Sequence, residues 1–358
     1  MAGRVVVQVV PPYPVVVGST PDLAAAVSEA VEPGVGVIVT DSGVGPLHAS
    51  SIKRELEGAG WRISDVIEVP AGEASKSLEV YSETLRRLAR SGLRRDGTLF
   101  ALGGGVVGDL GGFAAATYMR GVGLVQIPTS LLAMVDSSVG GKVGVDLPEG
   151  KNLVGSFFRP RVVVADLRLL ETLPGREISC GLAEVIKMGL LAGGDFFDDL
   201  VRVEAARSGD LEALEALVLH SVRFKAGVVA GDELEAGNRA ILNYGHTIGH
   251  GLEAAANYAL PHGEAISAGM IAASRLARER LGVDLVEEHE ALLRLADLPV
   301  EVRAVDPDAV ISAMARDKKR RSNDDSFSFV LLENIGSPVR NVPVSEDAVR
   351  RAIASVAG

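Results

Sequence analysis

The sequence of 358 residues is poor in cysteine, in lysine and in long apolar runs. The single cysteine, Cys180, excludes an intrachain disulfide framework and is typical of a reducing cytoplasm. No uncharged apolar run approaches the ~20 residues of a membrane-spanning helix, and the N-terminal segment lacks a signal-peptide layout. A net charge of −11 argues against an extended nucleic-acid partner, but a local cation cluster can still bind a small anion. These absences predict a cytoplasmic protein without a membrane or nucleic-acid partner.

Lysine is scarce even among the basic residues, because only eight of the 36 are lysine and the other 28 are arginine. An ammonium is a compact point charge, whereas a guanidinium is planar and fixed in its donor directions. The remaining lysines are therefore candidates for positions that need a compact cation, with chance retention at the surface as the alternative. They are Lys53, Lys76, Lys142, Lys151, Lys187, Lys225, Lys318 and Lys319.

The chain changes character near residue 170. Before this point, short apolar segments alternate with amphipathic ones, which predicts a parallel sheet covered by helices. The predicted strands are 35–40, 63–69, 97–102 and 122–128, with a last strand at the start of the segment 162–178, and the predicted helices are 21–31, 50–60 and 77–92. Beyond it the pattern is helical, apart from a strand-like run at 327–336. We expect a Rossmann-like α/β nucleotide-binding domain over residues 1–170 and an all-α domain, for metal and substrate, over 171–358.

Two glycine-rich segments are candidates for ligand binding. In "LFALGGGVVGDLGG", Gly103, Gly105 and Gly108 fit G-x-G-x-x-G, a turn that lets backbone N–H groups approach a pyrophosphate. The segment departs from the usual fingerprint, since it lies near residue 100 and no acid follows ~20 residues later. A tight strand–helix turn is the alternative. The polar stretch "DSSVGGKVGVDLPEGKN" (136–152) favours a binding loop over a solvated one.

The segment "NYGHTIGH" (243–250) suggests a metal site. With Asn243 as predicted N-cap, His246 and His250 lie on one face of a helix. His262 begins the next helical segment, and Glu184 lies three residues before Lys187 on an apolar helix. Catalytic zinc takes three protein ligands of the His₂Glu type, so this set offers one ligand too many. Spacing by itself favours the pair His246 and His250.

Taken together, the motifs resemble those of 3-dehydroquinate synthases, the second enzyme of the shikimate pathway. The resemblance covers essentially the whole chain, with the family's order and approximate spacing: "GGGVVGD", "MRG", "DSSVGGK", "GKN", "GLAEVIK", "NYGHTIGH", "PHGEA" and "DKK". It implies that Glu184, His246 and His262 bind a divalent metal ion, Zn²⁺ in the first place or Co²⁺. It also implies that His250 either lies behind the metal ligands or faces the phosphate of the substrate, so the pair favoured by spacing is not the metal pair.

The resemblance also implies the residues that bind NAD⁺ and substrate. The NAD⁺ residues are Asp41, Glu73, Lys76, Gly104, Gly105, Val106, Val107, Gly108, Asp109, Thr129, Ser130, Lys142, Lys151, Leu169, Leu170, Glu171 and Thr172. The substrate residues are Arg120, Lys142, Lys151, Asn152, Lys187, Lys225, Arg239, Asn243, His250, Lys318 and Lys319. Ser42 stands where the family often has asparagine.

The implied reaction converts a seven-carbon phosphorylated sugar acid into 3-dehydroquinate and inorganic phosphate. NAD⁺ transiently oxidises a hydroxyl, phosphate is eliminated, the hydride returns, and the ring closes by an intramolecular aldol step. The implied catalytic residues are Asp136, Lys142, Lys187, Lys225, Arg239 and His250. Lysine ammonium groups would stabilise developing oxyanions, Asp136 would hold or relay a hydroxyl proton, and a homodimer is expected.

Three other readings stay open at this point. A metal-dependent polyol dehydrogenase would share the two-domain layout but release NADH and need no phosphate-binding residues. A related sugar-phosphate cyclase could form an inosose or a valiolone. A non-catalytic NAD-binding regulator would not explain why Glu184, His246 and His262 are all present.

Overall fold

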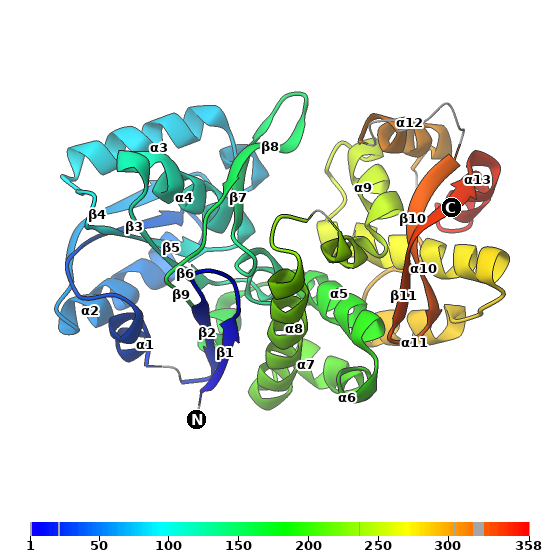
Figure 1. Ribbon diagram of the computed structural model, residues 1–358, viewed down its shortest axis with the longest axis horizontal. Coiled ribbons are helices and arrows are strands. Elements are labelled where there is room, and N and C mark those ends of the chain that lie inside the picture. The colour runs from blue at the N-terminus through cyan, green and yellow to red at the C-terminus, as the bar shows by residue number, and fades with distance from the viewer. Residues whose placement is uncertain (1, 21, 236, 304, 318–325, 358) are drawn as a thin grey trace. The chain divides into compact units, whose positions relative to one another are not determined.

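The computed structural model describes residues 2–357, apart from Pro21, Ala236, Ala304 and residues 318–325 (Figure 1). It divides into two compact units. The first comprises Met1–Pro174 with Leu214–Leu234, and the second comprises Gly175–Ala213 with Glu235–Gly358. The sequence predicts that residue 170 separates a nucleotide-binding domain from a domain for metal and substrate. This division of function stays a prediction.

A seven-stranded sheet forms the centre of the first unit, in the order β1-β2-β9-β6-β5-β3-β4. All neighbours are parallel except β1 and β2, which pair antiparallel at one edge. The strands are β1 (Gly3–Val7), β2 (Tyr13–Gly18), β3 (Val35–Asp41), β4 (Arg62–Val69), β5 (Thr98–Gly103), β6 (Gly123–Pro128) and β9 (Val162–Asp166). The strands predicted at β3, β4, β5, β6 and β9 are confirmed, and the antiparallel β1–β2 edge is an addition.

Helices cover both faces of this sheet. Successive residues of a strand point to opposite faces, so each strand contributes to the core on both sides. On β5, Leu99 and Ala101 join a core cluster with residues of α3 (Leu78–Arg90) and α4 (Gly105–Thr117). Phe100 and Leu102 join the opposite cluster with residues of α1 (Leu23–Ala30) and α2 (Ser50–Gly58). Because both faces of the sheet are buried, polar functional residues are expected in the loops and at the helix ends around it.

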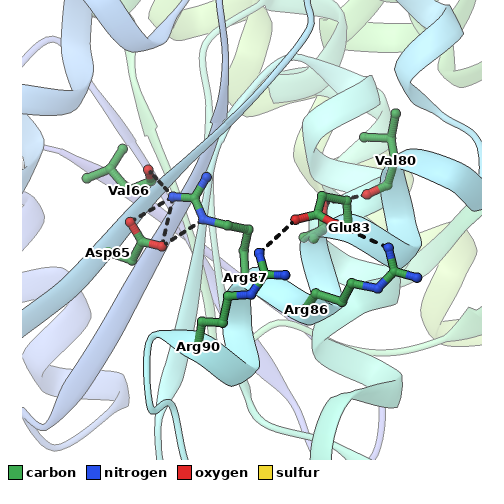
Figure 2. A network of polar contacts seen from close by, with 8 residues as sticks. Asp65, Val66, Val80, Glu83, Arg86, Arg87 and Arg90 are labelled. Atoms are coloured by element: carbon green, nitrogen blue, oxygen red, sulfur yellow. Dashed lines mark hydrogen bonds and ion pairs between the residues drawn. The ribbon is translucent and has the colours of Figure 1, made fainter.

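Polar contacts also fix helix α3 to the neighbouring strand β4, as Figure 2 shows. Arg87 Nη2 donates to both carboxylate oxygens of Asp65 at 2.9 Å and to the carbonyl of Val66 at 3.4 Å. On the same helix, Glu83 accepts from Arg86 and Arg90. The side chains of Arg87 and Asp65 are partly exposed, so this network orients the helix more than it stabilises the fold.

Two further elements complete the first unit. The antiparallel hairpin β7 (Lys142–Leu147) and β8 (Gly150–Phe157) contains most of the stretch 136–152 that the sequence marks as a binding loop. Helix α8 (Leu211–Gly231) belongs to this unit from Leu214 onward and brings Lys225 with it.

The second unit is built around the buried helix α10 (His262–Leu281), which contacts α5, α9, α11, α13 and β10. Its helices are α5 (Gly175–Ala192), α6 (Gly194–Asp198), α7 (Val203–Arg207), α9 (His246–Ala255), α11 (Val286–Leu295), α12 (Pro307–Asp317) and α13 (Glu346–Ala354). An antiparallel pair, β10 (Ser326–Asn334) and β11 (Ser337–Ser345), joins the predicted helices. The helical character of this half is confirmed. Within the described part of the chain, no helix is both long and apolar enough to cross a membrane.

Candidate functional site

The candidate metal ligands come from three helices that pack unusually closely. Glu184 lies on α5, His246 begins α9 and His262 begins α10. A Cβ added to Gly263 would lie 2.3 Å from the Cα of Cys180 on α5, and one added to Gly269 would lie 2.1 Å from the carbonyl oxygen of Gly245 before α9. Only glycine permits these backbone approaches, and they bring residues distant in the sequence to one place.

The start of α9 differs from the prediction. The N-cap is Gly245, with φ +77°, and not Asn243, so the predicted cap is wrong. A side chain at Gly245 would be strained by the positive φ and would lie 2.8 Å from Met270 Cγ. The left-handed turn at Gly245 thus sets where His246 enters its helix.

Glu184, His246 and His262 converge in the second unit. The Oε1 atom of Glu184 lies 3.5 Å from His246 Nε2 and 3.4 Å from His262 Nε2. The three potential ligand atoms lie within 4.8 Å of one another. The buried carboxylate of Glu184 faces the two imidazole rings through Oε1 and the ammonium of Lys187 through Oε2. A His₂Glu donor set whose ligand atoms converge in this way fits a divalent metal ion such as zinc.

The charges around these three residues set their protonation states. Burial raises the pKa of Glu184, but Lys187 and the two histidines outweigh it and hold the pKa well below its usual range. Burial and the Lys187 ammonium lower the pKa of His246, so this ring is neutral. Burial disfavours the charged form of His262, but hydrogen bonds to Glu184 and Glu253 raise its pKa to about 10. A metal ion would therefore replace a proton on His262.

Lys187 is a buried cation beside the candidate ligands. Its Nζ lies 2.5 Å from Glu184 Oε2 and donates to the carbonyl of Leu242 at 2.7 Å. The side chain is 2% exposed, so it cannot exchange these partners for water. An ammonium held in this way is a fixed positive charge next to the position of the metal.

His250 lies beside this ligand group without belonging to it. It is exposed, and its ring centroid lies 5.0 Å from that of His246 and 6.1 Å from that of His262. It belongs instead to a second group of potential ligands, with Glu253 and His262. Of the other predicted substrate residues in this unit, Arg239 is buried and Asn243 is exposed. Lys318 and Lys319 lie outside the described residues.

In the first unit, Lys76 and Asp109 form an ion pair with 2.7 Å between Nζ and Oδ2. Burial raises the pKa of Asp109 to about 6, although the Lys76 ammonium opposes the rise. Burial also opposes the charge of Lys76, but Asp109 outweighs it and raises the pKa of that ammonium. The pair is therefore charged at neutral pH, and it lies where α4 begins.

The glycine turn before α4 fits a bound pyrophosphate. Gly104 is the N-cap, and it offers no capping side chain to the first N–H groups of the helix. These groups can bind an anion, which the helix dipole also favours. Packing explains some of the glycines as well, because a Cβ at Gly103 would lie 2.6 Å from Val107 Cγ2 and one at Gly108 would lie 3.0 Å from Gln126 Oε1.

Asp136 and Lys225, both predicted to be catalytic, are brought together from the short π-helical segment Ala133–Ser137 and from α8. Lys225 Nζ donates to Asp136 Oδ1 and to the Asp136 carbonyl, each at 2.6 Å. The lysine side chain is buried and the carboxylate is partly exposed. This arrangement holds one oxygen of Asp136 in place beside a fixed cation.

Two predicted substrate residues have strained backbone. Arg120 and Asn152 have φ of +65° and +57°, a region that residues other than glycine rarely adopt. Such strain is concentrated at functional sites. Both side chains are exposed, as is Lys142 at the start of β7.

The remaining predicted NAD⁺ residues of the first unit lie at strand ends and in short helical turns. Asp41 Oδ1 accepts from the N–H groups of Gly43 and Val44 at 2.8 and 2.9 Å. Lys151 and Glu73 face each other, with Nζ and Oε1 3.3 Å apart. Thr129 and Ser130 follow β6, and Leu169, Leu170, Glu171 and Thr172 lie in the turn after β9.

Sequence reasoning missed two residues that contact the candidate ligands. The carbonyl of Tyr244 lies 3.1 Å from His246 Nδ1, and Glu253 Oε1 lies 3.2 Å from His262 Nδ1. A signal for Glu253 exists in the sequence, because it follows His246 by seven residues and therefore shares its helix face. Tyr244 acts through its backbone, so its side-chain type gives no signal.

Comparisons with known proteins decide the family. The family models described as 3-dehydroquinate synthase N-terminal and 3-dehydroquinate synthase C-terminal match residues 66–180 and 181–320. A 3-dehydroquinate synthase of Symbiobacterium thermophilum is 45% identical over 349 residues, which cover 94% of this chain and 96% of that protein. The chain belongs to the 3-dehydroquinate synthase family. The resemblance in the motifs is thereby confirmed, together with the lyase class and the shikimate pathway, and the dehydrogenase and regulator readings fall away.

Solved structures of related cyclases share the fold of this 3-dehydroquinate synthase family member. A 2-deoxy-scyllo-inosose synthase complexed with carbaglucose-6-phosphate, NAD⁺ and Co²⁺ is 28% identical, with a TM-score of 0.89, covering 99% of this chain and 100% of that one. The 2-epi-5-epi-valiolone synthase of Streptomyces hygroscopicus subsp. jinggangensis 5008, with NAD⁺ and Zn²⁺ bound, is 28% identical with a TM-score of 0.84, covering 96% of each chain. The higher identity to the Symbiobacterium protein favours the dehydroquinate branch over these two.

Proposed function

We propose that this protein converts 3-deoxy-D-arabino-heptulosonate 7-phosphate into 3-dehydroquinate and inorganic phosphate, with NAD⁺ and one divalent metal ion as its cofactors. The observation that carries the proposal is the convergence of Glu184, His246 and His262 in a chain of this family. Zn²⁺ suits this donor set, and Co²⁺ is the alternative. Related cyclases bind NAD⁺ with either metal.

Each cofactor supplies chemistry that side chains lack. When bound, NAD⁺ accepts and returns a hydride, and the metal ion acts as a Lewis acid on the substrate hydroxyl. The uncapped N-terminus of α4 would hold the pyrophosphate of NAD⁺, with the Lys76–Asp109 pair beside it. Glu184, His246 and His262 would hold the metal ion.

The residues of the second unit stabilise negative charge. The ammonium of Lys187 is fixed by Glu184 and by the Leu242 carbonyl, so it needs no reorganisation when an oxyanion develops. His250 and Arg239 are proposed to bind the phosphate group of the substrate by charge-assisted hydrogen bonds.

The residues of the first unit hold the substrate and move its proton. Asp136 is proposed to hold a substrate hydroxyl or relay its proton, while Lys225 keeps Oδ1 in place. Arg120, Lys142, Lys151 and Asn152 are proposed as phosphate and substrate contacts. The strained backbone at Arg120 and Asn152 fits a role in positioning.

Phosphate release under catalytic NAD⁺ tests the proposal. Purified protein with the heptulosonate phosphate, Zn²⁺ or Co²⁺, and NAD⁺ far below the substrate concentration should release one phosphate per substrate. No NADH should accumulate, because the hydride returns in each cycle. Stoichiometric NADH, or turnover only of a different sugar phosphate, would contradict the proposed reaction. A homodimer and a cytoplasmic location, both expected from the sequence, stay predictions.

A further inference from the structure

Glu253 is a buried carboxylate to which no motif assigns a role. It lies on α9, seven residues after His246 and three after His250, and it is 4% exposed. A carboxylate away from water is unfavourable unless charged or donating groups satisfy it. Its Oε1 lies 3.2 Å from Nδ1 of His262.

The two nitrogens of His262 face different carboxylates. Nδ1 faces Glu253, whereas Nε2 faces Glu184 Oε1 at 3.4 Å. The hydrogen bond at one ring nitrogen decides which tautomer a neutral imidazole adopts. A proton held on Nδ1 by Glu253 leaves the lone pair on Nε2, which points toward the other two candidate ligands. Glu253 therefore defines both the tautomer and the direction of the ring.

His246 has the same arrangement with a weaker acceptor. Its Nδ1 faces the carbonyl of Tyr244 at 3.1 Å, and its Nε2 faces Glu184. A backbone carbonyl orients the ring without adding a full charge, whereas a carboxylate also makes the imidazole a stronger ligand. Nδ1 of His262 thus faces a charged carboxylate, whereas Nδ1 of His246 faces an uncharged carbonyl.

We infer that Glu253 is a positioning residue that holds His262 with Nε2 toward the metal ion and strengthens its binding. This inference rests on the proposed metal site. A competing use of Glu253 is a second cation held by His250, Glu253 and His262, whose ligand atoms also lie within 4.8 Å of one another. A neutral imidazole has a single lone pair, so His262 cannot bind both cations at once without losing both ring protons. The geometry therefore favours one metal ion and an outer carboxylate.

Metal titration of the full chain tests the inference without relying on activity. Metal-free wild type, Glu253→Gln and Glu253→Ala are titrated with Co²⁺, followed by the visible absorption of the bound ion and then by Zn²⁺ competition. We expect one Co²⁺ per chain in wild type and a ~10–100-fold weaker affinity in Glu253→Ala. Glu253→Gln should fall between them, because its amide oxygen accepts the Nδ1 proton but carries no charge. The absorption bands of the alanine variant should also shift, since the ring of His262 is no longer fixed.

Three control variants make the result specific. Glu279→Gln removes an exposed carboxylate on the same helix as His262, where it pairs with Arg351, and should bind Co²⁺ like wild type. His262→Ala should lose tight binding, and His250→Ala should retain one Co²⁺. Circular dichroism and NAD⁺ binding show that each variant is folded.

Three outcomes would overturn the inference, and they differ from one another. Unchanged affinity and spectrum in Glu253→Ala would show that the carboxylate does not support the ligand. Two Co²⁺ ions in wild type, of which only one is lost in Glu253→Ala and His250→Ala, would make Glu253 a ligand of a second cation. Failure of wild type to bind any metal would remove the proposed metal site and this inference with it.

Discussion

Lys187 shows that a buried charged residue needs fixed polar partners. Its ammonium has partners at 2.5 and 2.7 Å and almost no exposure, so its position is fixed by the protein. Lys53, in contrast, lies on α2 with a partly exposed side chain, 3.8 Å from Glu57. The scarcity of lysine in the sequence makes both positions informative, because arginine supplies charge almost everywhere else.

We expect Lys187→Arg to lower kcat/KM by about 10²-fold although the charge is preserved. A guanidinium is larger and planar, so it would displace Glu184 or itself, and a misplacement of ~1 Å at a reacting centre has an effect of this order. Lys53→Arg is the matched control and should leave kcat/KM unchanged. Steady-state kinetics with thermal melts of both variants check the prediction. Near-wild-type activity of Lys187→Arg would show that the position needs only positive charge.

His289 is a buried histidine that the proposed chemistry does not use. Its Nδ1 faces the Leu285 carbonyl at 2.6 Å and its Nε2 faces the Tyr244 hydroxyl at 2.7 Å. Burial lowers its pKa from 6.5 to about 4, so the ring is neutral at pH 7 and accepts the tyrosine proton. It thereby anchors the residue whose carbonyl orients His246.

The depressed pKa of His289 predicts a loss of stability in acid. The unfolded chain takes up a proton below pH 6.5, whereas the folded chain resists protonation down to about pH 4. The contribution is therefore complete above pH 6.5, falls progressively between pH 6.5 and about pH 4, and is lost below that, by up to ~3 kcal/mol. Urea unfolding from pH 7.5 to pH 4 should show a steeper fall for wild type than for His289→Gln, which cannot titrate. Parallel pH profiles would mean that the ring is not held neutral.

At the scale of elements, glycine lets α5 and α10 approach each other at backbone distance. The two helices carry Glu184 and His262, so their separation sets the distance between two candidate ligands. The closest approach is at Gly263, where an added Cβ would lie 2.3 Å from the Cα and 2.6 Å from the carbonyl oxygen of Cys180. Backbone atoms cannot rotate away as a side chain can, so any larger residue must push the helices apart.

We expect Gly263→Ala to destabilise the protein by about 1–3 kcal/mol, the range for overpacking, and to weaken Co²⁺ binding. Gly175→Ala is the matched control on α5, because an added Cβ there meets no atom within 4 Å. Its better helix propensity should leave stability unchanged or up to ~1 kcal/mol higher. Thermal melts and Co²⁺ titration of the two variants test this. Equal stability and equal metal affinity in both would show that α5 and α10 can separate freely.

At the scale of the whole molecule, the predicted residues for the two cofactors lie in different units. The predicted NAD⁺ residues lie in the first unit and the candidate metal ligands in the second. Trp61, the single tryptophan, packs against Phe100 in the first unit, so its fluorescence reports on that unit. Far-UV circular dichroism reports on the helices of both units, so only this signal also follows the second unit.

We expect NAD⁺ to raise the midpoint of the Trp61 transition more than that of the circular dichroism transition, and Zn²⁺ to do the opposite. A ligand at 100 times its Kd stabilises the unit that binds it by about 2.7 kcal/mol. Thermal melts with both signals, with and without a chelator, measure the shifts. If either ligand moves both transitions equally, the units unfold as one and this separation is absent.

The sequence by itself determined the features that depend on neighbouring residues. Alternating apolar segments predicted β3, β4, β5 and β6, and the order of the motifs predicted the family. The strand-like run at 327–336 predicted β10, whereas its partner β11 and the edge pair β1–β2 were not predicted. Strand β11 contains two prolines and several polar residues, which give a weak local pattern. The cap of α9 was predicted at Asn243 and lies at Gly245, because a left-handed glycine turn and not a side chain begins that helix.

Only the tertiary structure decided which side chains meet. Spacing along one helix favours His246 with His250, because a helical repeat reports on a single face. In the structure Glu184, His246 and His262 meet instead, since three helices approach through glycines at a distance that no local pattern encodes. The same packing places Glu253 behind His262 and Lys187 beside Glu184. The sequence shows which side chains can act as ligands. Which of them meet is decided by the packing of backbone against backbone between segments far apart in the sequence.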